Sequence, residues 1–513
     1  MITGKNLVAG NWQTTSSAHQ FKTFNPKTVT PLPTAFEEAT EAQIDAAVVE
    51  AAAVAAHFAG TSFSERAQFL KTIQEEIQAH NSEILEIYMA ESALPEGRAK
   101  GELQRTLDQI ERFIELLKEG SFVQATLHTQ GPDLRKMLFP IGPVVVFGAS
   151  NFPLAFSTAG GDTISALAAG CPVIVKAHPY HAGTSEWVAQ AIHRALKKCD
   201  LPLGIFSHLG GQSHAVGRQL VCHPLVKAVG FTGSFAGGKA LYDLAQQRAC
   251  PIPVFAEMGS VNPIFILENR LKSDDGLSEL LAGSITMGTG QFCTNPGLIV
   301  ICDPAPNSSW GVALDEKIKT MELGPMVHSN IETSYTHQIS KLKTEFKELA
   351  IAPSAASGAC LGSVEASYFL AHPTLAEEVF GPFSLVVHCK NAKEQLAVAE
   401  SLSGQLTATL LGDMEDQQQL QALLPILQAK VGRLLFEGVP TGVAVTQAMQ
   451  HGGPYPATTD SRFSSVGVDA IYRWLRPVAY QDCPNEYLPA ALQNENPLQL
   501  HRHLNGVLTK AMV

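Results

Sequence analysis

Apolar residues recur along the chain with two different periods, which predict helices first and then strands alternating with helices. Thr40 followed by Gln43 forms a capping-box pattern ahead of the Ala-rich stretch 44–58, and helical periodicity continues to about Glu119. From Pro143 onward, short apolar runs alternate with helical stretches. The predicted strands of this region are residues 144–147, 173–176, 205–209, 226–231 and 254–257.

Near-continuous apolar strands alternating with helices are typical of a parallel sheet covered on both faces, because each crossover helix packs back on the sheet. The pattern therefore predicts a doubly wound α/β domain, built from residues 1–120 and 141–258. A second α/β domain is expected over residues 259–450. Its predicted strands are residues 263–267, 298–302, 385–388 and 408–411. Segments 121–140 and 468–513 are β-prone and lie outside both domains, so we expect them to pair as a protruding arm.

Composition and charge narrow the class of protein. A chain of 513 residues exceeds what one hydrophobic core usually supports, and its 45% hydrophobic residues are typical of an ordinary globular enzyme. A formal charge of -12 argues against a nucleic-acid surface. We read no signal peptide and no apolar run of about 20 residues, so we expect a soluble, cytoplasmic protein without a membrane partner. The nine cysteines show no metal-ligand spacing, so no metal site is predicted.

Chemistry is expected where the strands end, because ligands of doubly wound sheets bind beyond the carboxyl ends of the strands. Glu257 ends one run, and a carboxylate there can act as a base if partial burial raises its pKa. Cys293 is a candidate nucleophile, since a thiolate attacks carbonyl carbons without a dedicated triad. Both have a plainer interpretation: a small buried apolar residue for Cys293 and a solvated strand-end charge for Glu257. A third candidate, Asn151, follows the predicted strand 144–147, and its plainer interpretation is a turn residue.

Two segments resemble the aldehyde dehydrogenases. The segment Gly290-Gln291-Phe292-Cys293-Thr294 resembles the nucleophile segment of that family, and Glu257-Met258-Gly259 resembles its general-base segment. The resemblance implies an aldehyde dehydrogenase-like fold with a Rossmann-type cofactor domain, a catalytic domain and a β oligomerisation arm. It also implies that Cys293 attacks an aldehyde, that Glu257 activates water, and that Asn151 donates to the oxyanion beside the Cys293 backbone N–H. Ser150 stands where many relatives carry Trp, which indicates a divergent branch.

The same resemblance implies a nicotinamide cofactor. The turn 231–234, which contains Gly233 and Ser234, and the nearby Gly238 resemble the start of a helix in this family. The N-terminus of that helix faces the cofactor pyrophosphate. Lys176 is expected to hold the adenosine ribose. The segment 378–382 resembles the stretch that binds the nicotinamide ribose through Glu378 and places Phe380 near the ring.

The residue that follows Lys176 by three positions bears on the choice between NADP and NAD. NAD-preferring relatives commonly carry a Glu there, whereas this chain carries Pro179. Loss of that carboxylate removes repulsion of a 2'-phosphate, so NADP is favoured, with NAD still possible. His178 and His214 are candidate neighbours of the phosphate.

The segments 147–157 and 451–456 resemble one branch, which holds 2,5-dioxovalerate (α-ketoglutarate semialdehyde) dehydrogenases and NADP-dependent fatty aldehyde dehydrogenases. We expect a homodimer or homotetramer that oxidises 2,5-dioxovalerate to 2-oxoglutarate. The alternatives are a fatty aldehyde dehydrogenase and a coenzyme A-acylating or noncatalytic relative. Phe156, His451 and Arg462 are the candidate substrate-binding residues, with Arg462 as the cation for a 2-oxo acid.

Overall fold

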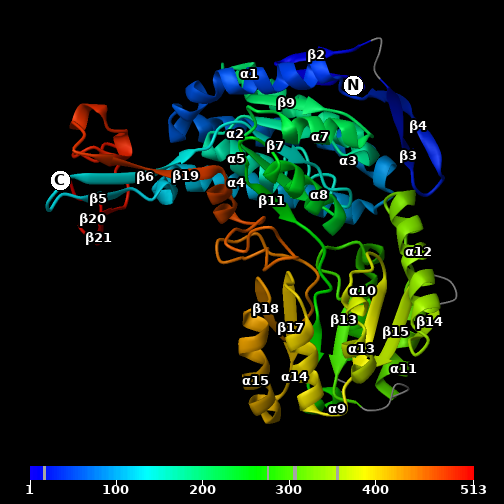
Figure 1. Cartoon of the computed structure of the whole chain (residues 1–513). Helices are drawn as coiled ribbons and strands as arrows, with labels where there is room; N and C mark the ends of the chain where they lie inside the picture. The colour runs from blue at the N-terminus through cyan, green and yellow to red at the C-terminus, as the bar shows by residue number, and fades with distance from the viewer. Residues whose placement is uncertain (16–18, 274–275, 304–308, 354–357) are drawn as a thin grey trace.

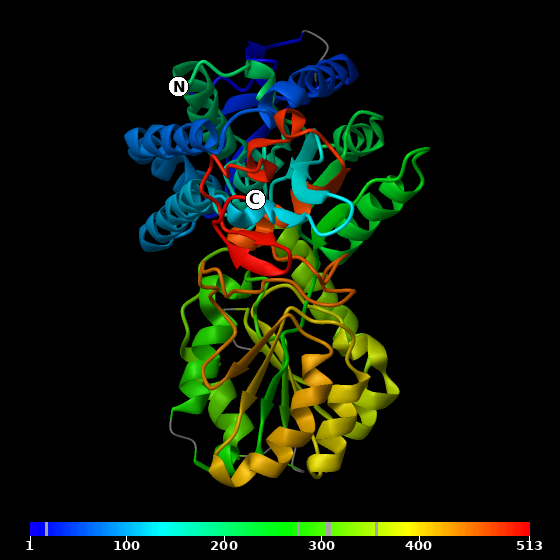
Figure 2. The ribbon, with the colours of Figure 1, turned by 90° about the vertical axis from the view of Figure 1, so that its left-hand side faces the viewer.

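The chain forms two α/β units and a smaller projecting sheet (Figure 1). The computed structural model describes residues 1–15, 19–273, 276–303, 309–353 and 358–513. The first unit contains the N-terminal half of the chain, and the second unit lies below it in the view of Figure 1. Figure 2, turned by 90°, shows the projecting sheet facing the viewer in front of the first unit.

The first sheet has the strand arrangement of a doubly wound domain. Its order is β11-β10-β7-β8-β9-β1-β2, and the strands β7 to β11 run parallel to one another. The strands are β1 (Asn6–Val8), β2 (Asn11–Gln13), β7 (Val144–Phe147), β8 (Val173–Lys176), β9 (Phe206–Leu209), β10 (Ala228–Thr232) and β11 (Val254–Glu257). All five predicted strands are confirmed. The antiparallel edge strands β1 and β2 were not predicted, because each has only three residues.

The strand order places a ligand crevice between β7 and β10. The chain runs from β7 through β8 to β9 on one side, and then returns to β10 on the other side of β7. At such a switch point the loops after the two strands separate and leave room for a ligand. The segments after β7 and β10 contain Asn151 and Ser234, respectively.

Alternate residues of the strands pack against helices on opposite faces. Val144 and Val146 belong to one apolar cluster, and Val145 belongs to the other, as the two-residue period of a strand requires. The helices of the first cluster are α2 (Phe63–Ala79), α3 (Asn81–Ser92), α4 (Glu96–Glu119), α5 (Gly161–Ala169) and α6 (Ala182–Lys198). Those of the second are α1 (Glu41–Ala59), α7 (His214–Cys222) and α8 (Phe235–Gln246).

Helix α1 begins where the sequence predicted. Thr40 is its N-cap, and the reciprocal hydrogen bonds of a capping box with Gln43 are both present. Among the described residues, α1 is also the one helix that is long and apolar enough to cross a membrane by length and composition alone. Helices in protein cores can have the same length and composition, and Ile44, Ala47 and Val48 of α1 pack in the second cluster.

The second unit is built on another seven-stranded sheet, of order β14-β15-β16-β13-β12-β17-β18, in which only β14 pairs antiparallel. Its strands are β12 (Ile264–Ile266), β13 (Leu298–Ile301), β14 (Ala350–Pro353), β15 (Cys360–Glu365), β16 (Phe383–His388), β17 (Thr407–Leu411) and β18 (Arg433–Phe436). Its helices are α9 (Glu268–Ser273), α10 (Leu277–Thr286), α11 (Ser309–Thr320), α12 (Ser329–Glu345), α13 (Ala366–Ala371), α14 (Ala392–Ser401) and α15 (Gln417–Gln428). The four predicted strands are confirmed, whereas β14, β15 and β18 were missed.

The two β-prone segments pair in a five-stranded sheet of order β19-β6-β5-β20-β21. It consists of β5 (Thr126–His128), β6 (Leu134–Pro140), β19 (Leu475–Gln481), β20 (Arg502–Leu504) and β21 (Val507–Thr509). Strands β6 and β19 pair antiparallel over seven residues, from Leu475 opposite Pro140 to Gln481 opposite Leu134. This sheet projects from the first unit and contains the C-terminus (Figure 1). Strands β3 (Gln20–Asn25) and β4 (Thr30–Glu37) form a separate hairpin.

Candidate active site

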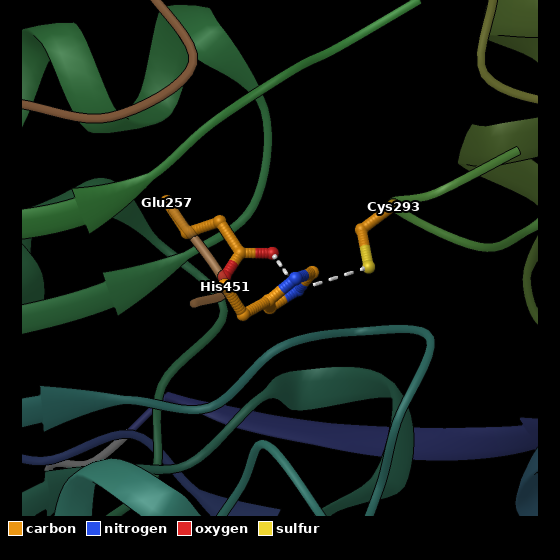
Figure 3. Close-up of side chains that lie close together, drawn as sticks. All are labelled: Glu257, Cys293 and His451. Carbon is orange, nitrogen blue, oxygen red and sulfur yellow. Dashed lines mark hydrogen bonds and ion pairs between the residues drawn. The ribbon is translucent and has the colours of Figure 1, made fainter. Parts of the chain in front are cut away.

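Three side chains from distant segments meet between the two units (Figure 3). Glu257 is the last residue of β11, Cys293 precedes β13, and His451 lies in the segment between β18 and β19. His451 Nε2 lies 3.0 Å from Glu257 Oε1 and 3.6 Å from Cys293 Sγ. The side chains of Glu257 and His451 are almost fully buried, and the Ser465 hydroxyl donates to Glu257 Oε2. The imidazole therefore connects the carboxylate with the thiol.

The charges around this cluster favour a neutral thiol beside an ionised carboxylate. Burial raises the pKa of the Cys293 thiol, and the nearby Glu257 carboxylate raises it further. Burial also acts to raise the pKa of Glu257, but His451 and the hydrogen bond from Ser465 outweigh it and hold that pKa below its usual value. A neutral thiol needs a base at hydrogen-bonding range before it can attack, and His451 is in that position.

The backbone before Cys293 fixes the position of the thiol. Gly288, Thr289 and Gly290 all have left-handed backbone angles, with φ of 58°, 59° and 67°. A Cβ added to Gly290 would lie 2.2 Å from the carbonyl carbon of Gly381, so only glycine fits this close approach. The Asn262 amide donates to the Cys293 carbonyl oxygen at 2.9 Å. The nucleophile segment is therefore held from both sides.

Asn151 lies beside the nucleophile segment, where an oxyanion donor is needed. It follows β7 at the crevice, and its Nδ2 donates to the Gln291 carbonyl oxygen at 3.0 Å. A carboxamide nitrogen carries two hydrogens, so this bond leaves one for another acceptor. The geometry is compatible with the predicted role, with one hydrogen of the amide already used to hold its orientation.

The turn that was predicted to bind the cofactor pyrophosphate lies at the opening of α8. Ser234 is the N-cap, and its Oγ accepts from the Gly237 N–H at 3.2 Å, so this hydroxyl caps its own helix. A Cβ added to Gly238 would lie 2.6 Å from Met258 Cγ, and one added to Gly233 would lie 2.7 Å from the Phe231 ring. The glycines therefore let the turn and the helix pack tightly against β10 and β11. The helix N-terminus at the crevice fits an anionic group of a cofactor.

Lys176 lies at the end of β8 as predicted. Its Nζ donates to the Gly211 carbonyl oxygen at 2.6 Å, and burial lowers its pKa to about 8. Glu38, from the segment after β4, also contributes a negative charge near Lys176. It accepts from the Gln212 and Ser213 N–H groups at 2.9 Å each. No local sequence signal indicated Glu38, because it lies far from the motif in the chain.

His178, a candidate neighbour of the phosphate, lies just after β8 and before a short 3-10 helix. Burial lowers the pKa of His178 well below its usual value, so the imidazole is neutral at physiological pH. Its Nδ1 accepts from the Tyr180 N–H at 3.4 Å, and its ring stacks on His181. Pro179 follows as the first residue of a short 3-10 helix and places no charge there.

Glu378 lies against the turn that follows Glu257. A Cβ added to Gly259 would lie 2.5 Å from Glu378 Oε2, which shows how closely this carboxyl approaches the turn. Burial raises the pKa of Glu378 to about 8, so the group is protonated at neutral pH and can donate a hydrogen bond. Phe380 is partly exposed and precedes Gly381, against which Gly290 packs. The segment with Glu378 and Phe380 thus adjoins the nucleophile segment.

Among the three predicted substrate-binding residues, Phe156 lies close to His451. Its ring lies 6.3 Å from the His451 ring and 5.3 Å from the Phe152 ring. Arg462 is corrected: its side chain is 79% exposed and forms a bidentate ion pair with Asp460. His451 is also corrected, because it bridges Glu257 and Cys293 and so belongs with the catalytic groups.

The cluster of Glu257, Cys293 and His451 also has the donor types of a metal site. One oxygen, one sulfur and one nitrogen atom of these residues lie within 4.8 Å of one another. Carboxylate, thiolate and imidazole are ligands that zinc accepts. The sequence did not predict this combination, because the three residues come from separate segments that meet only in the fold.

Comparison with known proteins gives a consistent result. The model of the aldehyde dehydrogenase family matches residues 12–453. The chain is 42% identical to alpha-ketoglutaric semialdehyde dehydrogenase 2 of Azospirillum brasilense, over 99% of this chain and 98% of the relative. It is also 42% identical to an alpha-ketoglutaric semialdehyde dehydrogenase of Acinetobacter baylyi, over 99% of both chains.

Solved structures share the fold at lower identity. Methylmalonate-semialdehyde dehydrogenase of Oceanimonas doudoroffii aligns with a TM-score of 0.78 at 18% identity, over 94% of this chain and 99% of that one. Betaine aldehyde dehydrogenase of Staphylococcus aureus, solved with NAD+, aligns with a TM-score of 0.80 at 17% identity, over 94% of this chain and 95% of that one.

Proposed function

Because this chain belongs to the aldehyde dehydrogenase family, we propose that it oxidises α-ketoglutaric semialdehyde (2,5-dioxovalerate) to 2-oxoglutarate with a nicotinamide cofactor. The contact of His451 with both Glu257 and Cys293 carries the chemical part of this proposal. The names of the two relatives at 42% identity support the substrate.

In the first half of the proposed reaction, Cys293 Sγ attacks the aldehyde carbon. The Nε2 proton of His451 passes to Glu257, and the freed Nε2 accepts the thiol proton. Glu257 releases its proton to solvent before the second half. The new oxyanion accepts hydrogen bonds from the Asn151 amide and from the Cys293 backbone N–H. The product of this step is a thiohemiacetal on Cys293. A nicotinamide cofactor, when bound, would supply the acceptor for a hydride from the substrate carbon, which would leave a thioester on Cys293.

In the second half, Glu257 takes a proton from water, which attacks the thioester carbon. The pKa of Glu257 is held below its usual value, so the carboxylate is ionised at neutral pH and can accept that proton. The thiol of Cys293 leaves with a proton returned through His451, and the acid is released. A buried base beside the thioester favours hydrolysis over acyl transfer to coenzyme A. The complete set of Glu257, Cys293 and His451 likewise argues against a noncatalytic relative.

The test compares formation of reduced cofactor at 340 nm with α-ketoglutaric semialdehyde and with a long-chain aldehyde, each with NADP and with NAD. We expect turnover of the semialdehyde to exceed that of the long-chain aldehyde. The opposite preference would assign the chain to fatty aldehydes. Reduction of cofactor that requires added coenzyme A would instead indicate an acylating enzyme.

For the cofactor we propose NADP over NAD, because Pro179 places no carboxylate where it would repel a 2'-phosphate. Lys176 would hold the adenosine ribose and the N-terminus of α8 would face the pyrophosphate. Glu38, a carboxylate near Lys176, weighs against this preference, although its oxygens accept from Gln212 and Ser213.

Substitution of Pro179 tests the preference directly. Pro179→Glu is expected to lower kcat/KM for NADP by about tenfold or more, because like charges would face each other, and to change kcat/KM for NAD much less. Pro179→Ala is the matched control, since it removes the ring without adding charge. Equal losses for NADP and NAD in Pro179→Glu would contradict the proposal.

We further propose a cytoplasmic homo-oligomer, a dimer or a tetramer, that associates through the projecting sheet. Val507 and Leu508 of β21 are more than half exposed on this sheet, although both are apolar. Exposed apolar side chains on a strand are typical of an association surface. Light scattering of the purified protein would give the number of subunits.

A further inference from the structure

A small pocket adjoins the catalytic cluster, between helix α4 and the turn that follows β7. Its lining includes Arg105 and Gln109 of α4, Phe156 and Ser465. Two of these residues touch the cluster: Ser465 donates to Glu257, and the Phe156 ring lies 6.3 Å from the His451 ring. A substrate held at Cys293 can therefore extend a substituent toward this pocket.

Arg105 brings a positive charge to the pocket without a fixed anionic partner. Within the described part of the chain, no hydrogen bond or ion pair of its guanidinium is present, and its Cζ lies 5.5 Å from the centre of the Phe156 ring. Burial lowers the pKa of Arg105, while the nearby Cys293 and Glu102 act in the opposite direction. A partly buried cation without a partner is costly, so an anionic ligand is expected to stabilise it.

The α4 carboxylate whose charge acts on Arg105, Glu102, is already engaged elsewhere. Glu102 Oε1 accepts from the Leu154 and Ala155 N–H groups, at 2.8 and 3.0 Å. Glu102 Oε2 accepts from the Tyr88 hydroxyl at 2.6 Å and from Arg98 at 3.2 Å. Arg98 is thereby neutralised, and its guanidinium also lies over the rings of two phenylalanines. Arg105, which lines the pocket, is therefore left for a ligand.

Gln109 adds an open hydrogen-bond donor next to Arg105. The two residues are four positions apart on α4, so their side chains lie on one face of the helix. Gln109 is 6% exposed, and its Nε2 has no hydrogen-bond acceptor among the described residues. Buried donors are nearly always satisfied, so an acceptor from a ligand is expected here as well.

We propose that Arg105 and Gln109 bind the 2-oxo acid end of the substrate, with the guanidinium on the carboxylate and the Gln109 amide on an adjacent oxygen. This inference rests on the proposed function and explains how a short acidic aldehyde is distinguished from a neutral one. An alkyl tail would leave both polar groups unpaired in the pocket. Arg105 thus takes the place that the sequence analysis assigned to Arg462.

The test measures kcat/KM for α-ketoglutaric semialdehyde and for pentanal, a neutral aldehyde with the same number of carbons. Arg105→Leu is expected to lower kcat/KM for the semialdehyde about 100-fold or more and to change that for pentanal less than about threefold. Gln109→Leu is expected to lower the value for the semialdehyde about tenfold. Arg112→Leu is the matched control, because Arg112 is an exposed arginine of the same helix, and it should change neither value.

A binding measurement separates recognition from folding and from chemistry. Titration calorimetry with 2-oxoglutarate should give a Kd raised at least about tenfold in Arg105→Leu and in the milder variant Arg105→Lys. Gln109→Leu should weaken binding of 2-oxoglutarate more than that of glutarate, which lacks the 2-oxo oxygen.

Three outcomes separate this inference from the proposed function. Wild-type protein that oxidises pentanal but not the semialdehyde would overturn the proposed substrate itself. Wild-type protein that oxidises the semialdehyde, with an equal loss for both aldehydes in Arg105→Leu and unchanged 2-oxoglutarate binding in Arg105→Lys, would overturn only the role of Arg105. A selective loss in Arg462→Leu in place of Arg105→Leu would return the carboxylate site to Arg462.

Discussion

Cys293→Ala is expected to lower kcat for aldehyde oxidation by about 10⁴-fold or more, because the bond to the substrate carbon forms through this sulfur. Steady-state formation of reduced cofactor measures the loss. Cofactor affinity should stay within about threefold of wild type, since the proposed cofactor groups lie after β8 and β10 and on the segment 378–382. Activity that survives the substitution would exclude the thiohemiacetal mechanism.

Cys222→Ser is a suitable control for this substitution, because Cys222 is exposed at the end of α7, and it should leave kcat unchanged. Alkylation gives an independent measure of Cys293. Since the pKa of its thiol is raised, little thiolate is present at pH 7. The rate at which iodoacetamide modifies Cys293 should therefore rise about tenfold per pH unit between pH 7 and 9.

Glu257→Gln is expected to block hydrolysis while leaving the first half of the reaction intact. Rapid mixing should show a burst of about one reduced cofactor per active site, followed by a steady state slowed by about 10² to 10³-fold. The glutamine keeps the shape of the side chain but cannot accept the proton of water. Mass spectrometry of the quenched protein should detect the thioester on Cys293.

Although Glu257→Gln is expected to slow turnover, it should speed the alkylation of Cys293. The Glu257 carboxylate contributes to the raised pKa of Cys293, so its neutralisation lowers that pKa. Iodoacetamide should therefore modify Cys293 faster in Glu257→Gln than in wild type at pH 7. Glu268→Gln, at an exposed position, serves as the control for both readouts. A variant with no burst and slower alkylation would indicate that Glu257 acts on the thiol.

The sequence predicted the parts of the fold that local patterns determine. The five predicted strands of the first sheet are short, apolar and separated by helices, and each was found within about two residues of its position. Strand β15 was missed because Gly362 and Ser363 interrupt its apolar pattern, although it pairs with β16 over six residues. The three-residue strands β1 and β2 were missed because tertiary pairing, rather than periodicity, defines them.

In the candidate site, the sequence predicted the residues that lie in recognisable motifs. Cys293, Glu257 and Asn151 lie in recognisable segments, and the structure places them around one crevice. His451 was singled out, yet its contact with both Glu257 and Cys293 depends on the path of the chain after β18. Arg105 lies in an amphipathic helix where an arginine is normally solvated, so only packing against Phe156 distinguishes it. Arg462, in contrast, was singled out from the sequence, but its loop is exposed and its side chain pairs with Asp460.

Because Gly290 packs closely on Gly381, a motion between the two units would affect the two halves of the reaction differently. The nucleophile segment and the segment with Glu378 are held together, because the backbones of Gly290 and Gly381 meet and Asn295 Nδ2 donates to the Gly381 carbonyl oxygen at 3.1 Å. Glu257, in contrast, is anchored in the first unit. A slight rocking of one unit against the other would change the reach of the base while the thiol keeps its alignment with Glu378. Substitutions at the boundary of the units can therefore adjust the rate of thioester hydrolysis without altering any residue that reacts.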